Sequence, residues 1–146
     1  MSGIVVGIDA SSHSMAALQW AMREAAVKRA PLTVITVEIV AASGWGGSQV
    51  YSADYELREK AQKAAEEAVA AIAKSMSEAA PESVTVQALL GQPAEQLIEA
   101  AKDADQLVLG RRGTGGFSRL TMGSISSQVA QHASCPVTIV PDEPQA

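Results

Sequence analysis

Short apolar runs alternate with longer amphipathic stretches along most of the chain. Continuous apolar runs rich in β-branched residues, such as IVVGI at 4–8, are typical of strands buried on both faces of a sheet. Stretches whose apolar residues recur every three or four positions predict helices instead. We expect strands at 4–8, 32–40, 84–90, 106–109 and 137–140, and helices at 15–30, 54–80, from 93 onward, and at 125–133.

Two of the expected helices have a clear apolar stripe. In the first helix the stripe is Met15, Leu18, Met22 and Ala25, and Pro31 follows the helix. In the helix at 54–80, charges of both signs fall between the apolar positions, so its outer face should be solvated. The inner positions expected for that helix are Leu57, Ala61, Ala64, Ala68, Ile72 and Met76.

The regular alternation of strands and helices predicts an α/β fold. A strand, a helix and a further strand connect by right-handed crossovers, which gives a single open five-stranded parallel sheet with helices on both faces. We expect one domain over 1–146, with its core at 4–140 and a loose tail at 141–146. Ligands of such sheets bind beyond the carboxyl ends of the strands, where the strand order reverses. Asp9, Val37, Gly91 and Gly110 are all expected near those ends.

Composition narrows the class of protein. The 146 residues are 47% hydrophobic and 18% charged, which is typical of a globular chain. The net charge of −5 and the scarcity of aromatic residues argue against nucleic acid as a partner. The single cysteine, Cys135, excludes an internal disulfide and fits a reducing compartment. Without a signal-peptide pattern or a run of about 20 apolar residues, we expect a cytoplasmic protein that does not enter a membrane.

A glycine-rich segment stands apart from the rest of the chain, because 106–141 holds no Asp or Glu. Its notable residues are Gly110, Arg111, Arg112, Gly113, Gly115, Gly116, Arg119, Gly123, Ser124 and Ser126. Glycines let a ligand approach the main chain, and the N–H groups of a glycine-rich loop or a helix N-terminus attract anions. A phosphate site is therefore one interpretation. A flexible loop before a Ser-capped helix is the other that composition leaves open.

The spacing of the glycines shows which known phosphate-binding motif the segment resembles. A P-loop needs a Lys directly after its last glycine, and no Lys follows Lys102. The dinucleotide fingerprint lies at the first strand-to-helix turn, whereas these glycines come late. The spacing Gly110-x2-Gly113-x9-Gly123-Ser124 resembles instead the G-x2-G-x9-G-S/T pattern of the universal stress proteins, specifically their ATP-binding branch. The resemblance runs from about residue 4 to residue 140.

This resemblance implies a Rossmann-like fold of the adenine nucleotide alpha hydrolase type. It implies ATP, with or without Mg²⁺, as the bound cofactor, and a homodimer formed through the last strand. The corresponding function is that of a nucleotide-dependent stress-response regulator or binding module. Two alternatives within the family stay open, namely a slow ATPase or phosphate donor and a member that binds cyclic AMP. A structural member without nucleotide is a third, against which the complete glycine spacing counts.

The family roles can be carried over position by position. The resemblance matches Gly7-Ile8-Asp9 to the end of the first strand, and implies that Asp9 contacts the ribose and that main-chain groups at Val37 contact adenine. The resemblance assigns the phosphates to Gly110, Gly113, Gly123 and Ser124, with Ser126 and the amide of Ile125 close behind. Further candidates from the same segment are Arg111, Arg112, Gly115 and Gly116, although the two arginine side chains could equally be solvated. Judged alone, Asp9 could equally form a turn and Val37 could be a core residue.

The residue pattern gives little support to an enzymatic function. Ser124 is not in a G-x-S-x-G elbow, and neither His13 nor His132 lies beside a metal-ligand cluster in the sequence. Phosphoryl transfer needs charged and positioning groups around the γ-phosphate. The segment offers backbone amides, serines and arginines, which suit holding ATP better than cleaving it.

Overall fold

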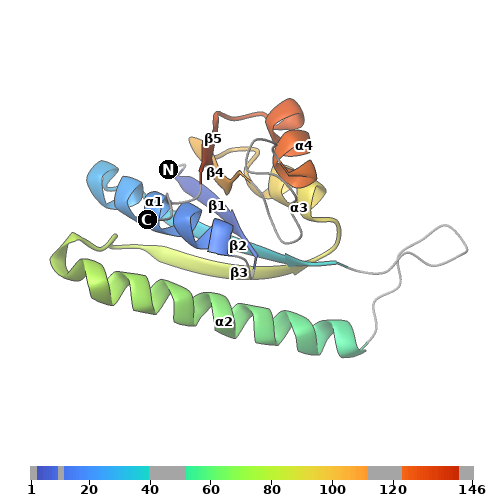
Figure 1. Ribbon diagram of the computed structural model, residues 1–146, viewed down its shortest axis with the longest axis horizontal. Coiled ribbons are helices and arrows are strands. Elements are labelled where there is room, and N and C mark those ends of the chain that lie inside the picture. The colour runs from blue at the N-terminus through green and yellow to red at the C-terminus, as the bar shows by residue number, and fades with distance from the viewer. Residues whose placement is uncertain (1–2, 10–11, 40–51, 112–122, 142–146) are drawn as a thin grey trace, which may run out of the picture.

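A computed structural model describes residues 3–9, 12–39, 52–111 and 123–141. Strands and helices alternate through these ranges as the sequence pattern predicts (Figure 1). The elements are β1 (Ile4–Ile8), α1 (Ser12–Lys28), β2 (Leu32–Glu38), α2 (Ser52–Met76), the 3₁₀ turn η1 (Ser77–Ala79), β3 (Val84–Leu90), α3 (Pro93–Ala100), β4 (Gln106–Gly110), α4 (Ser124–His132) and β5 (Val137–Val140). The predicted α/β class is confirmed.

The strands form one parallel sheet in the order β3-β2-β1-β4-β5. The chain therefore builds the sheet outward from β1 in one direction as far as β3, and then crosses to β4 and β5 on the other side. This reversal between β1 and β4 is the topological switch point at which open α/β sheets bind ligands. Val6 pairs with Val34 on one side and with Val108 on the other, so β1 is the central strand.

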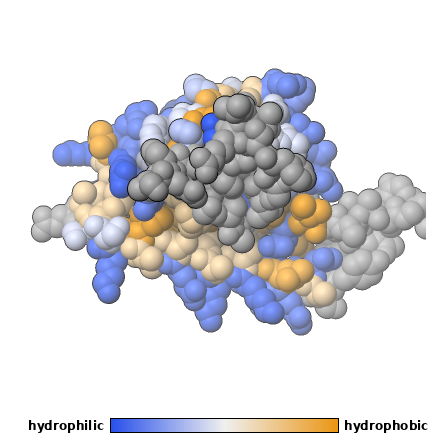
Figure 2. Space-filling model, viewed as in Figure 1, coloured by the Kyte–Doolittle hydropathy of each residue, from blue (hydrophilic) through white to orange (hydrophobic). Residues whose placement is uncertain are grey.

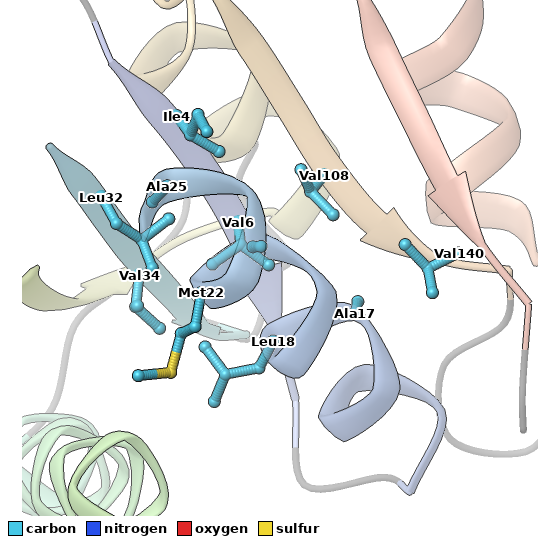
Figure 3. Packing of buried hydrophobic residues seen from close by; sticks show 11 residues of the cluster. Ile4, Val6, Ala17, Leu18, Met22, Ala25, Leu32, Val34, Val108 and Val140 are labelled. Atoms are coloured by element: carbon cyan, nitrogen blue, oxygen red, sulfur yellow. The ribbon is translucent and has the colours of Figure 1, made fainter. Parts of the chain in front are cut away.

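The helices cover both faces of the sheet, and each face has its own apolar core. The cores follow the alternation of side chains along a strand, because Val6 and Val108 point to one face while Val5 and Leu107 point to the other. α1 and α2 pack on the first face, where Leu18, Met22 and Ala25 of the predicted α1 stripe are fully buried (Figure 3). α3 and α4 pack on the second face.

The helix ends differ from the sequence expectation by a few residues. α1 begins at Ser12 and ends at Lys28, before the predicted end at Ala30. Arg29 adopts a left-handed φ of 54°, and the Ala30 N–H bonds the Ala25 carbonyl 3.0 Å away. Such an ending normally uses glycine, so an arginine gave no signal of it. The helix thus stops before Pro31 constrains it.

The buried side of α2 agrees with the expected stripe at Ala68, Ile72 and Met76, but departs from it nearer the start of the helix. Leu57 is 49% exposed and Ala64 is exposed, while Ala65 is buried. The residues that pack inward are Ala65, Ala68, Val69, Ile72, Ala73 and Met76. Most successive residues of the expected set are four positions apart. In a helix of 3.6 residues per turn, each such step goes about 40° beyond a full turn, so the expected set does not stay on one side of the helix. Hydrophilic side chains line the lower rim in Figure 2, where α2 lies in the same view of Figure 1.

Candidate nucleotide site at the carboxyl edge of the sheet

Asp9 directly follows β1 at the switch point, and Ser14 holds the turn that it begins. The Asp9 N–H donates to Ser14 Oγ at 3.1 Å, and the Ser14 hydroxyl donates to the Asp9 carbonyl at 2.7 Å. Ser14 is 4% exposed, so water competes little for these hydrogen bonds. The Ser14 hydroxyl therefore fixes the backbone of Asp9 relative to α1.

The chain leaves β4 and returns at α4 at almost the same place. The Gly123 N–H donates to the Arg111 carbonyl at 2.8 Å, and the Ser126 hydroxyl donates to the Gly110 carbonyl at 2.7 Å. The Arg111 N–H in turn donates to the Val140 carbonyl at 3.1 Å. Ser126 is buried, which strengthens its bond. The N-terminus of α4 is therefore pinned to the carboxyl end of β4.

The first turn of α4 offers main-chain donors at this place. The first intrahelical bond runs from the Ser127 N–H to the Gly123 carbonyl at 3.0 Å. The N–H groups of Ser124, Ile125 and Ser126 consequently have no acceptor within the helix, and Gly123 has no side chain to cap them. A helix N-terminus with such donors is a suitable site for an anion.

Arg111 brings a positive charge to the same corner. Its side chain is half-buried, and among the residues that the structure describes its Nε is a buried atom with no hydrogen-bond partner. Buried polar groups of native proteins are nearly always hydrogen-bonded, so this guanidinium nitrogen is a group that a bound acceptor would satisfy. A phosphate oxygen is an acceptor of the required charge.

Val37 and Gly91 extend the edge on the other side of β1. Val37 pairs with Leu89 and packs half-buried against the second core, next to β1 in the sheet. Gly91 has a φ of 143°, which side-chain-bearing residues rarely adopt, and its N–H donates to the Glu38 carbonyl at 3.0 Å. The ends of β2 and β3 are thereby joined beside the predicted adenine position.

Gly7 has a packing reason that the sequence could not reveal. A Cβ at this position would lie 2.8 Å from Leu109 Cδ2 and 2.8 Å from Leu97 Cδ2. An added Cβ would therefore force these two buried leucine side chains to shift, whatever the role of Gly7 toward a ligand.

A Gly7→Ala variant should accordingly be destabilised, by about 1–3 kcal/mol, the usual cost of overpacking a well-filled core. Urea unfolding followed by circular dichroism measures the change. A Leu97→Ala second substitution makes space for the added methyl group, and should cost less in the Gly7→Ala background than in the wild type. Independent, additive losses would contradict the contact.

The structure thus gathers most of the predicted residues that it describes. Asp9 lies at the end of β1, while Gly110, Arg111, Gly123, Ser124, Ile125 and Ser126 surround the end of β4, the neighbouring strand. Val37 lies on β2, the neighbour of β1 on its other side. Gly7 of β1 faces the core, against Leu97 and Leu109. The predicted residues Arg112, Gly113, Gly115 and Gly116 lie outside the described residues.

Cys135 lies half-buried against the second core, before β5. Burial raises the pKa of its thiol, and a hydrogen bond with the Leu107 backbone lowers the pKa by less. Since only the thiolate is nucleophilic, alkylation by iodoacetamide should require a higher pH than for free cysteine. The rate–pH profile in folded and urea-unfolded protein checks this, and a folded midpoint at or below the unfolded one would contradict it.

Within the described ranges, no group of three or more His, Cys, Asp or Glu residues is placed to hold a metal ion. The helices of the described part are each too short or too polar to cross a membrane.

Comparison with known proteins adds independent information. The sequence model of the "Universal stress protein family" matches residues 1–141. A curated universal stress protein from Mycolicibacterium smegmatis is 34% identical over 99% of this chain, which corresponds to 49% of that protein. The chain spans about half the length of the curated relatives that it matches.

Solved structures of similar proteins share the fold. The universal stress protein UspA from Lactobacillus plantarum has a TM-score of 0.76 and 25% identity, covering 95% of this chain and 97% of its own. A universal stress protein in complex with cAMP has a TM-score of 0.68 and 24% identity, with coverages of 97% and 98%. The universal stress protein from Archaeoglobus fulgidus in complex with dAMP has a TM-score of 0.67 and 21% identity, with coverages of 96% and 98%.

Proposed function

The chain belongs to the universal stress protein family, and we propose that it binds ATP at the carboxyl edge of its sheet and acts as a nucleotide-dependent stress-response regulator or binding module. The pinning of α4 to β4 supports this proposal most. Because the Gly123 N–H bonds the Arg111 carbonyl, the main-chain donors of α4 lie at the end of β4, beside β1. Arg111 lies at the same place, and its guanidinium Nε has no partner among the described residues. In this proposal the functional unit is one domain over residues 1–146, with its core at 4–140.

In this proposal the triphosphate lies against the first turn of α4. The amides of Ser124, Ile125 and Ser126 supply donors and the positive end of the helix dipole. Arg111 Nε supplies a charged donor, and Gly110, Arg112, Gly113, Gly115 and Gly116 complete the loop around the phosphates. Any Mg²⁺ arrives with the nucleotide, because phosphate oxygens supply much of its coordination in such sites.

The nucleoside lies across the ends of β1 and β2. Asp9, whose backbone Ser14 fixes, accepts hydrogen bonds from the ribose hydroxyls. Main-chain groups at Val37 contact the adenine. The neighbours solved with cAMP and dAMP support an adenine nucleotide in general, since their ligands share adenine with ATP. The preference for ATP rests on the glycine spacing.

Cyclic AMP is the second candidate ligand, because one neighbour of the same fold was solved with it. Its single cyclic phosphate would leave much of the glycine-rich segment without a partner. Competition titrations of nucleotide-free protein with ATP, ADP, adenosine and cAMP decide between the two. The proposal requires ATP to bind most tightly, and a stronger competition by cAMP would replace ATP with the cyclic nucleotide.

We also propose that the protein acts in the cytoplasm, as a homodimer formed through β5, which lies at an edge of the sheet. Its protein partners would recognise the nucleotide-bound form.

An Asp9→Ala variant should bind ATP and ADP more weakly, and to the same extent. Both nucleotides carry the ribose, and the loss of a hydrogen bond to a charged group costs roughly 1.5–3 kcal/mol. Isothermal titration measures the change. Glu82→Ala removes one negative charge at an exposed position before β3, at the opposite edge of the sheet, and serves as the matched control. Wild-type affinity of Asp9→Ala for both nucleotides would contradict the ribose role.

A further inference from the structure

The sheet has two edge strands, β3 and β5 (Figure 1). An edge strand presents unpaired N–H and C=O groups to which a strand of another molecule can bond. Along a strand, these groups point alternately to either side, so only every second residue of β3 faces outward. The Ser83 carbonyl and the Gly91 N–H both bond to β2. Odd-numbered residues of β3 therefore face β2, and even-numbered residues face outward.

Gln62 of α2 occupies the middle of the outward side of β3. Its Nε2 donates to the Val86 carbonyl at 2.8 Å, and its Oε1 accepts from the Ala88 N–H at 2.8 Å. A side-chain amide has the same donor and acceptor as a peptide group. Gln62 thus takes the position that one peptide of an added strand would take, at the centre of a seven-residue strand.

The outward side of β5 differs. The carbonyls of Pro136 and Val140 accept bonds from Leu107 and Arg111 in and after β4, so the even-numbered residues face inward. Val137 and Ile139 consequently present their main-chain groups outward. In the part of the chain that the structure describes, no side chain bonds these groups.

We propose that Gln62 closes the β3 edge, so that a second copy of this chain can pair with the sheet only at β5. A molecule with one open edge forms a closed two-fold dimer, whereas a molecule with two open edges can extend into an open chain. The closure of β3 is independent of nucleotide. Only the wild-type state, a dimer through β5, rests on the function proposed above.

The test compares Gln62→Ala with Gln87→Ala by sedimentation velocity over a range of protein concentrations. Gln87 is an exposed glutamine of β3 whose main chain faces β2, so its loss leaves the edge closed. We expect Gln62→Ala to form species larger than those of the wild type as concentration rises, and Gln87→Ala to match the wild type. In Gln62→Ala under conditions of little association, the Ala88 amide should exchange hydrogen roughly five- to tenfold faster.

A second substitution tests the mechanism. Proline lacks an N–H and is tolerated on an edge strand where that N–H faces outward, as at Ala88. Gln62→Ala with Ala88→Pro should therefore return to the wild-type association state. Should Gln62→Ala fold poorly, Gln62→Met keeps the length and helix propensity of the side chain and removes both bonds.

Two results would overturn the proposal: wild-type association of a folded Gln62 variant whose Ala88 amide exchanges faster, or larger species that persist with Ala88→Pro. A monomeric wild type would contradict only the dimer through β5, and not the closure of β3. Gln62→Ala should then still gain an association step. ATP titration of the same samples reports separately on the nucleotide site.

Discussion

A Gly123→Val variant is expected to bind ATP at least about tenfold more weakly than the wild type, a loss of about 1.4 kcal/mol. Gly123 has a φ of −69°, which any residue adopts, so backbone strain does not account for the loss. The branched side chain would instead stand before the first turn of α4, where the phosphates are proposed to approach the amides. Isothermal titration measures the affinity, with adenosine as the control ligand.

The loss should follow the number of phosphates, being largest for ATP, smaller for ADP and least for adenosine. Salt should weaken the binding of ATP more than that of adenosine in the wild type, because Arg111 and the helix N-terminus act on charge. Valine is a poorer helix cap than glycine, so circular dichroism must confirm that the variant is folded. Equal losses for adenosine and ATP in a folded protein would show that Gly123 does not lie beside the phosphates.

A Leu18→Ala variant should lose about 2–5 kcal/mol of unfolding free energy, the range for deleting a buried leucine side chain. Leu18 is fully buried between α1 and the sheet, in the core formed by β1, β2 and β4 (Figure 3). This core fixes α1 against the sheet and, through the Ser14 bonds, the backbone of Asp9. Urea unfolding measures the change.

Val27→Ala on the same helix provides the matched control. Val27 is 83% exposed, and surface substitutions of this kind usually change stability by less than about 0.5 kcal/mol. A Leu18→Ala variant no less stable than Val27→Ala would contradict the packing of α1 on the sheet.

The sequence predicted the elements well because hydrophobic periodicity is a local property. The bounds of β1, β3 and β5 agree with the expectation, and the family recognised from the glycine spacing is confirmed. The end of α1 could not be predicted, because it depends on a left-handed arginine that no pattern marks. The order of the strands could not be read either, since a right-handed crossover does not say on which side of β1 the next strand lies.

The candidate site was predictable in its residue types but not in its contacts. Glycines, Arg111 and Ser126 could be named from spacing and charge. The bonds from Ser126 to the Gly110 carbonyl and from Gly123 to the Arg111 carbonyl join positions 16 and 12 residues apart. The packing of Gly7 against Leu97 and Leu109 and the bonds of Gln62 to β3 depend on elements distant in sequence. Only the folded chain brings them together.

An NMR titration of ¹⁵N-labelled protein with ATP tests most directly whether the nucleotide binds at the carboxyl edge of the sheet. We expect saturable shifts that are largest for the amides of Ser124, Ile125 and Ser126, together with Asp9, and small shifts along the outer face of α2. ADP should reproduce the shift at Asp9. Saturable shifts confined to α2, or unchanged spectra at millimolar ATP, would contradict nucleotide binding at this edge.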